Sequence, residues 1–200
     1  MRLIGMLDSP YVRRTAISLR MMGLDFELSQ LSVFRNFDEF KAISPVVKAP
    51  SLVTDSGQVL MESTLILEYA ERLAPSKSLM PADAAEYVKT QHLIGFALAA
   101  NEKTVQMVYE KSQRPTEKYH QPWFDRVSGQ LQRAYGELER ETPAGWFGAN
   151  KPNQADITVA VAWRFTQSRF PEVVTSAVHP KLAAHSARAE VLPPFAELNF

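Results

Sequence analysis

The end of the first apolar segment places a serine hydroxyl where it could stabilise an anion. Leu3–Leu7 reads as a short strand, and a helical pattern begins at Pro10. Proline is favoured at the first position of a helix, so Ser9 is the predicted N-cap residue. Its hydroxyl then lies beside unpaired backbone N–H groups at the positive end of the helix, and a thiolate would suit this position. The competing interpretation is a plain N-cap that adds only about 1 kcal/mol of stability.

Composition excludes several other chemistries. The chain contains no cysteine, which rules out disulfides, thiolate metal sites, a protein thiol nucleophile and thiol–disulfide exchange. The four histidines show no close spacing of the kind that binds zinc, so we predict no metal site. These histidines are His92, His120, His179 and His185.

Charge and hydrophobicity are typical of a soluble globular protein. The 200 residues carry a formal net charge of zero, with 46% hydrophobic and 22% charged residues. This balance argues against nucleic acid or a membrane surface as the main partner. The longest apolar runs, such as Ile94–Ala100, fall far short of the roughly 20 residues needed to span a bilayer. We therefore expect a cytoplasmic protein.

The first ~75 residues predict the element order βαβαββα. Its first βαβ unit should be parallel and right-handed. Arg13 and Arg14 are expected on the exposed face of the first helix. The predicted elements are a strand at Leu3–Leu7, a helix from Pro10 that ends before Gly23, a strand at Asp25–Ser29, a helix at Phe37–Ile43, a hairpin of Pro50–Val53 and Gln58–Met61, and a helix at Thr64–Leu73 capped by Ser63.

Helical patterns occupy the rest of the chain after a proline- and serine-containing linker at Ala74–Asp83. Asn153 and Asp156 form a predicted capping box, and the helix that follows is apolar on almost every side, which favours a central position. The tryptophans Trp123, Trp146 and Trp163 are expected in the core. The predicted helices cover about Ala84–Lys111, about Glu117–Glu141, Ile157–Phe170 and Pro180–Glu190, and the two predicted domains cover 1–76 and 84–200.

The order and spacing of three motifs resemble the serine-type cytosolic glutathione S-transferases of bacteria. The motifs are Ser-Pro-Tyr-Val-Arg-Arg at the first turn, Ser44–Pro50, and Glu62-Ser63 before the third helix. The resemblance covers essentially the whole chain. It implies a thioredoxin-like N-terminal domain followed by an all-helical C-terminal domain, the fold of this family.

The resemblance also implies a glutathione site. Ser9 matches the residue that donates a hydrogen bond to the glutathione sulfur, and Tyr11 is the rival donor. Ala49, where valine is commoner, would pair its backbone with the glutathione cysteine, ahead of Pro50 at the family's cis-proline position. The remaining matches concern the ends of the ligand: Lys48 approaches the glycine carboxylate, and Glu62 and Ser63 hold the γ-glutamyl end.

Family members differ most in the pocket for the electrophile. We expect this pocket between the domains, formed by Val33–Phe37 and the inner ends of the second-domain helices. The candidate lining residues are Tyr11, Phe34, Met107, Tyr109 and Trp163.

The implied activity is the addition of the glutathione thiolate to a small apolar electrophile, with glutathione as cosubstrate and no metal. A detoxification role and a homodimer are expected from the family. One alternative is a non-catalytic module of the same fold that binds glutathione or a protein, such as a stress regulator. Another is a glutathione-dependent isomerase or peroxidase, which shares the activation step.

Overall fold

The computed structural model describes all 200 residues, and the chain forms two compact units. The first unit contains Met1–Leu79 together with the C-terminal segment Val191–Phe200, and the second contains Met80–Glu190. The sequence-predicted range 84–200 differs from this division at the C-terminal segment.

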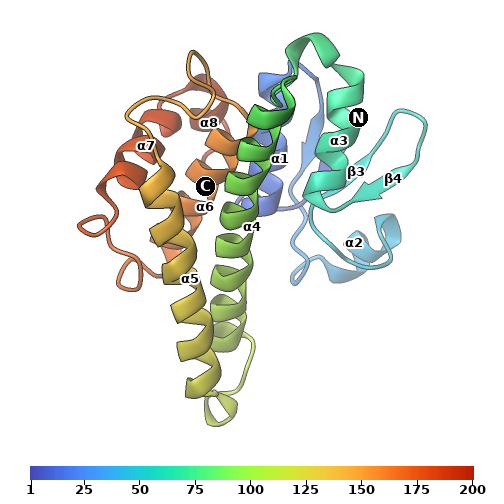
Figure 1. Cartoon of the computed structure of the whole chain (residues 1–200). Coiled ribbons are helices and arrows are strands. Elements are labelled where there is room, and N and C mark those ends of the chain that lie inside the picture. Colours follow the sequence, from blue (N-terminus) through green and yellow to red (C-terminus); the bar gives the residue numbers. More distant parts are fainter. The chain divides into compact units, whose positions relative to one another are not determined.

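The first unit is built on a four-stranded mixed sheet with the strand order β2-β1-β3-β4 (Figure 1). Strand β1 pairs parallel with β2 and antiparallel with β3, and β3 pairs antiparallel with β4. This is the predicted βαβαββα topology. The elements are β1 Arg2–Ile4, α1 Pro10–Met21, β2 Glu27–Ser29, α2 Phe37–Ile43, β3 Ser51–Val53, β4 Val59–Met61 and α3 Ser63–Leu73, followed by a 3-10 turn at Pro75–Lys77.

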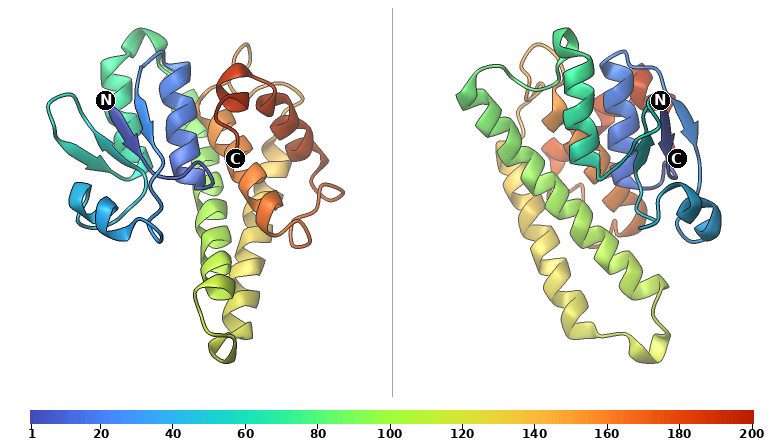
Figure 2. Two further views of the ribbon diagram at one scale, coloured as in Figure 1. Left: turned by 180° about the vertical axis from the view of Figure 1, so that it is seen from behind. Right: turned by 90° about the vertical axis from the view of Figure 1, so that its right-hand side faces the viewer.

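Two helices cover one face of this sheet. Figure 2 shows α1 and α3 side by side on one side of the strands and α2 on the other. Leu3, Ile17 and Ile66, from β1, α1 and α3, are fully buried. The apolar stripes of the two helices thus form a common core with the central strand.

The expected exposure of Arg13 and Arg14 on α1 is wrong. Their exposed fractions are 0% and 1%. The Arg13 guanidinium donates from Nε to the carbonyl of Leu198 at 2.9 Å and from Nη2 to the carbonyl of Phe195 at 3.2 Å. These bonds tie the C-terminal segment, which includes the short helix α8 (Pro193–Ala196), to α1. A buried cation therefore holds the two ends of the chain in one unit.

The second unit is all-helical. Its elements are α4 Ala84–Ser112, a 3-10 turn at Thr116–Lys118, α5 Gln121–Glu141, α6 Gln154–Arg169 and α7 Pro180–Glu190. Helices α4 and α5 form a long pair, and α6 packs on α4 (Figures 1 and 2). Val159, Ala160 and Val161 on α6 are all fully buried, which confirms the central position predicted for this helix.

The capping box at the start of α6 is confirmed. The Asn153 side chain accepts hydrogen bonds from the N–H groups of Ala155 and Asp156 at 2.8 and 3.2 Å, and the Asp156 carboxylate accepts from the N–H of Asn153 at 2.8 Å. Asp156 also accepts from the N–H groups of Phe147 and Gly148. One buried carboxylate thus fixes both the helix start and the preceding loop. None of the helices is long and apolar enough to cross a membrane.

Candidate functional site

Ser9 is the N-cap of α1, as predicted, with Pro10 as the first helical residue. Its Oγ accepts a hydrogen bond from the N–H of Val12 at 3.4 Å, which is a long contact. Because the oxygen acts there as an acceptor, the hydroxyl proton is available to a second group. The first turn of α1 contains no acidic residue to offset the positive end of the helix. This corner can therefore favour a bound anion.

A close backbone approach brings the segment before β3 to the same corner. The Ala49–Pro50 peptide bond is cis, and Val47 has a φ of 53°. A Cβ atom at Gly5, whose φ is +140°, would lie 2.5 Å from Val12 Cγ2 and 3.2 Å from Ala49 Cβ. Only glycine fits between these neighbours. The sequence-based prediction gave Gly5 no role, although a glycine at the end of a strand indicates a close backbone approach of this kind.

A hydrogen bond from the Ser51 side chain to the backbone holds the Lys48–Ser51 segment. The Ser51 hydroxyl donates to the carbonyl of Lys48 at 2.8 Å, so the chain turns tightly into β3. Lys48 is exposed, Ala49 is half-buried and Pro50 is buried. The Lys48 ammonium can therefore reach a ligand in solvent.

Glu62, and not Ser63, is the N-cap of α3. Its carboxylate Oε2 accepts from the N–H of Thr64 at 3.1 Å, and its φ is 76°. Ser63 is the first residue of the helix and is buried, and its hydroxyl donates to Glu62 Oε1 at 3.2 Å. The predicted cap is off by one residue because the longer glutamate side chain can reach forward, past the first helical residue, to the N–H of Thr64.

Arg14 joins this second corner and was missed by sequence reasoning. Its Nη1 donates to the Ser63 hydroxyl at 2.9 Å. Burial lowers the pKa of the Arg14 guanidinium to about 10, an effect that the nearby Glu62 carboxylate partly offsets. The side chain stays protonated at neutral pH. Its spacing of three residues from buried Ile17 is the signal that places both on one helix face.

The residues predicted for the electrophile pocket fall in both units. In the first unit, Tyr11 is half-buried and Phe34 is 54% exposed. In the second, Met107 and Trp163 belong to the hydrophobic core, with exposed fractions of 1% and 4%, whereas Tyr109 is 45% exposed. The pocket itself stays a prediction.

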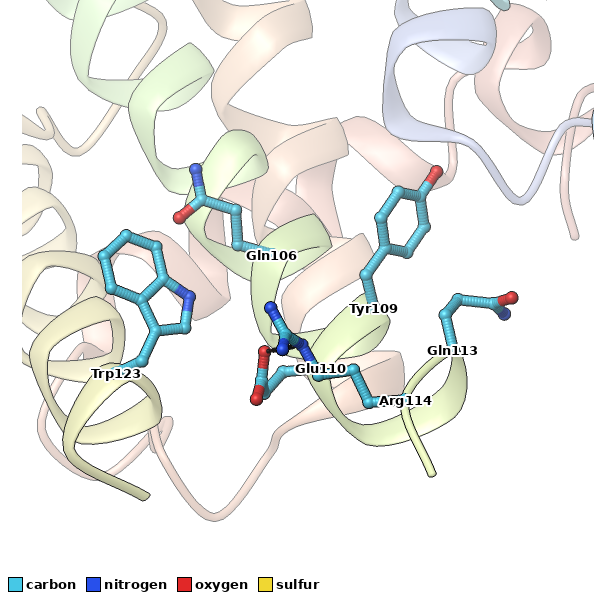
Figure 3. A pocket seen from close by; sticks show the side chains of 6 residues that line it. All are labelled: Gln106, Tyr109, Glu110, Gln113, Arg114 and Trp123. Atoms are coloured by element: carbon cyan, nitrogen blue, oxygen red, sulfur yellow. Dashed lines mark ion pairs between the residues drawn. The ribbon is translucent and has the colours of Figure 1, made fainter. Parts of the chain in front are cut away.

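Tyr109 lines a cavity of about 260 Å³ near the end of α4. Figure 3 shows its six lining side chains, with the ion pair between Glu110 and Arg114 among them. Trp123, from the start of α5, is 40% exposed and lines this cavity, so its expected place in the core is wrong. The others are Gln106 and Gln113. Burial raises the pKa of the Tyr109 hydroxyl, which therefore remains a hydrogen-bond donor at neutral pH.

The structure contains no group of three or more His, Cys, Asp or Glu side chains that could hold a metal ion.

Comparison with known families gives two matches. The model described as "Glutathione S-transferase, N-terminal domain" matches residues 3–78, and the one described as "Glutathione S-transferase, C-terminal domain" matches residues 121–188. Among curated proteins, the chain is 26% identical over 162 residues to the uncharacterized GST-like protein YibF of Escherichia coli, covering 81% of this chain and 80% of that protein. It is 24% identical over 152 residues to the maleylacetoacetate isomerase of Pseudomonas aeruginosa, covering 72% of this chain and 71% of that protein.

Two solved structures are similar over nearly the whole chain. A glutathione S-transferase from Methylobacterium radiotolerans, in complex with glutathione sulfonate, is 28% identical with a TM-score of 0.91 and covers 98% of this chain and 92% of its own. A glutathione transferase family member from Pseudomonas fluorescens Pf-5, with bound glutathione, is 29% identical with a TM-score of 0.88 and covers 99% of this chain and 98% of its own.

Proposed function

Because the chain belongs to the glutathione S-transferase family, we propose that it binds glutathione on its first unit and adds the glutathione thiolate to a small apolar electrophile. The observation that carries this proposal is the Ser9 corner, where a free hydroxyl proton lies at the positive end of a helix. The two similar structures hold glutathione and glutathione sulfonate, which supports the same ligand here.

Activation of the thiol is the step that Ser9 would promote. A free thiol has a pKa of about 8.5 and is only a few per cent ionised at neutral pH, yet the thiolate is the nucleophile. Each unit by which its pKa falls corresponds to about 1.4 kcal/mol of preferential thiolate stabilisation. One hydroxyl donor together with the helix dipole would supply about one to two units. Ser9 donates a hydrogen bond in this step and does not remove the proton, which passes to solvent.

Other residues would hold the tripeptide. The Ala49 backbone, next to the cis bond at Pro50, would pair with the cysteine of glutathione, and exposed Lys48 would meet its glycine carboxylate. Glu62 and Ser63, at the N-terminus of α3, would take the γ-glutamyl group. The thiolate would then attack the electrophile, forming a carbon–sulfur bond while the leaving group departs with its electron pair.

The finer expectations for this protein are proposals on the same basis. The electrophile would contact some of Tyr11, Phe34, Met107, Tyr109 and Trp163. We also infer a homodimer, a cytoplasmic location and a detoxification role, as expected for the family.

A glutathione-dependent isomerase is the second candidate, favoured by the similarity to maleylacetoacetate isomerase. In such a reaction the thiolate adds to a conjugated double bond, the bond rotates, and the thiolate is eliminated again. Glutathione is regenerated in an isomerase and consumed in a transferase. Measuring free thiol during turnover of each substrate class therefore separates the two.

The decisive experiment compares the wild type with Ser9→Ala and Ser9→Thr. Calorimetry measures glutathione binding, and the ultraviolet absorbance of the thiolate measures the pKa of the bound thiol. We expect the wild type to lower this pKa, Ser9→Thr to retain most of the effect, and Ser9→Ala to return the pKa toward the free value. Absence of glutathione binding by the wild type at millimolar concentration would refute the proposed function.

A further inference from the structure

Arg14 is a buried cation whose hydrogen bonds go to neutral hydroxyl groups. It is 1% exposed and is among the largest fully buried side chains of the protein. Removing a charged group from water is unfavourable unless the group is paired and hydrogen-bonded. Its Nη1 donates to the hydroxyls of Ser63 at 2.9 Å and Thr64 at 3.5 Å, while its Nε has no hydrogen-bond partner. A methionine would fill this space without that penalty, so the charge needs another explanation.

The hydrogen bonds from Arg14 run in one direction. A guanidinium has only donors, so the Ser63 oxygen must accept from it and the Ser63 proton must point elsewhere. In the structure this proton is donated to Glu62 Oε1 at 3.2 Å. Arg14 therefore fixes the direction in which the Ser63 hydroxyl can donate.

The N-terminus of α3, where this hydroxyl lies, combines positive groups with the Glu62 carboxylate that caps it. The helix dipole is positive there, the first turn of α3 contains no acidic residue, and the Arg14 guanidinium is hydrogen-bonded to Ser63. Glu62 is the nearby anion, and its Oε2 is already engaged by the N–H of Thr64. A carboxylate that bound here could take the Ser63 proton, while Glu62 keeps the N–H of Thr64.

We propose that Arg14 is a positioning residue for glutathione, which turns the Ser63 hydroxyl toward the α-carboxylate of the γ-glutamyl group and supplies the charge behind it. This inference rests on the proposed function, since it assigns a role within the glutathione site. Arg14 acts through Ser63 and does not itself touch the ligand. When the carboxylate binds, the Ser63 proton turns to it from Glu62 while the bond from Arg14 is kept.

A matched pair of ligands isolates this role from a general effect on folding. The first is glutathione, and the second is γ-aminobutyryl-cysteinylglycine, in which hydrogen replaces the α-carboxylate of the γ-glutamyl group. The ratio of the two dissociation constants, which we call the carboxylate preference, is measured by calorimetry. A residue that only stabilises the fold would weaken both ligands alike.

The variants are Arg14→Met, Arg14→Lys and Ser63→Ala, with Arg13→Met as the matched control. Arg13 is the neighbouring arginine on α1 and is equally buried, but it bonds to the carbonyls of Phe195 and Leu198. Circular dichroism in the near ultraviolet establishes that each variant is folded.

We expect Arg14→Met to lower the carboxylate preference about tenfold, which corresponds to 1.4 kcal/mol. The loss should come from weaker glutathione binding, with the analogue unchanged within about twofold. Arg14→Lys should keep most of the preference because an ammonium also only donates. Arg13→Met should leave it unchanged, and Ser63→Ala should lower it as much as Arg14→Met.

Several results would overturn the proposal. One is an Arg14→Met variant that keeps the wild-type carboxylate preference, even if it binds both ligands more weakly by the same factor. Should Arg14→Met fail to fold, Ser63→Ala still decides, because retention of the preference in that variant contradicts the proposed path through Ser63. A wild type that binds neither ligand would refute the proposed function itself, and this inference with it.

Discussion

Replacing Arg13 with methionine tests how the C-terminal segment is held. The methionine keeps much of the apolar volume but removes the hydrogen bonds to the carbonyl of Leu198 at 2.9 Å and to that of Phe195 at 3.2 Å. It also removes the cation from the rings of Phe195 and Phe200, whose centroids lie 5.8 and 5.4 Å away. Two buried carbonyl groups then lose a charged donor.

The expected loss of stability follows from these contacts. Hydrogen bonds from a charged group contribute about 1.5–3 kcal/mol each, and each ring contact adds about 0.5–1 kcal/mol. Loss of these contacts together would cost about 4–8 kcal/mol. The variant also no longer buries a guanidinium, which restores several kcal/mol. We expect the free energy of unfolding to fall by about 2–4 kcal/mol, since removal of one partner from a buried polar contact is consistently destabilising.

Two measurements check this expectation. Urea denaturation gives the change in the free energy of unfolding, and hydrogen exchange reports whether the amides of Val191–Phe200 lose protection before the rest of the first unit. Arg13→Lys is the control, because it keeps a charge but cannot reach both carbonyls with one rigid group. Unchanged or increased stability in Arg13→Met, with a protected C-terminal segment, would refute the reasoning.

Two further predictions concern Asp156, which holds the loop before α6, and His185 of α7, which lies beside it. Asp156→Asn should lower the free energy of unfolding by about 2–4 kcal/mol, because an amide has one acceptor oxygen for three backbone N–H groups. Asn153→Ser keeps a cap and should lower it by less than about 1 kcal/mol. Urea denaturation compares the two variants, and equal losses would contradict the role given to Asp156. Burial lowers the pKa of His185, so the unfolded chain takes up a proton that the folded chain excludes. The contribution of neutral His185 to the free energy of unfolding should therefore be fully present above about pH 6.5. It should be lost below this pH, by up to about 1.4 kcal/mol per pH unit. Unfolding measured between about pH 7 and 5.5 should show a smaller pH dependence in His185→Asn, and an identical dependence would contradict this prediction.

The elements could be predicted where local chemistry determines them. Pro10 after Ser9 marks the start of α1, and the Asn153–Asp156 box marks the start of α6; both signals lie within four residues of the feature they define. The bounds of α2 and α7 agree with the predicted Phe37–Ile43 and Pro180–Glu190. Local signals of this kind require no knowledge of distant contacts.

Features that depend on distant partners could not be predicted in the same way. Arg14 meets Ser63, 49 positions later, and Arg13 meets Leu198, 185 positions later. Nothing in the sequence near either arginine shows that a partner will cover it, and an arginine is ordinarily exposed. Trp123 is the opposite case, because its size favoured the core while it lines an open cavity. At the candidate site, the close approach at Gly5 depends on the return of the chain at Ala49.

The bond between Arg13 and Leu198 also orders events during synthesis of the chain. Helix α1 is made before the second unit, but the segment that covers its buried arginine follows the whole of Met80–Glu190. Domains generally fold in the order in which they emerge, and long-range contacts slow folding. The first unit therefore remains incomplete, with a charged side chain still in water, while the second unit is made. This unit can therefore close only after Val191–Phe200 has been made, although most of its residues precede the whole second unit.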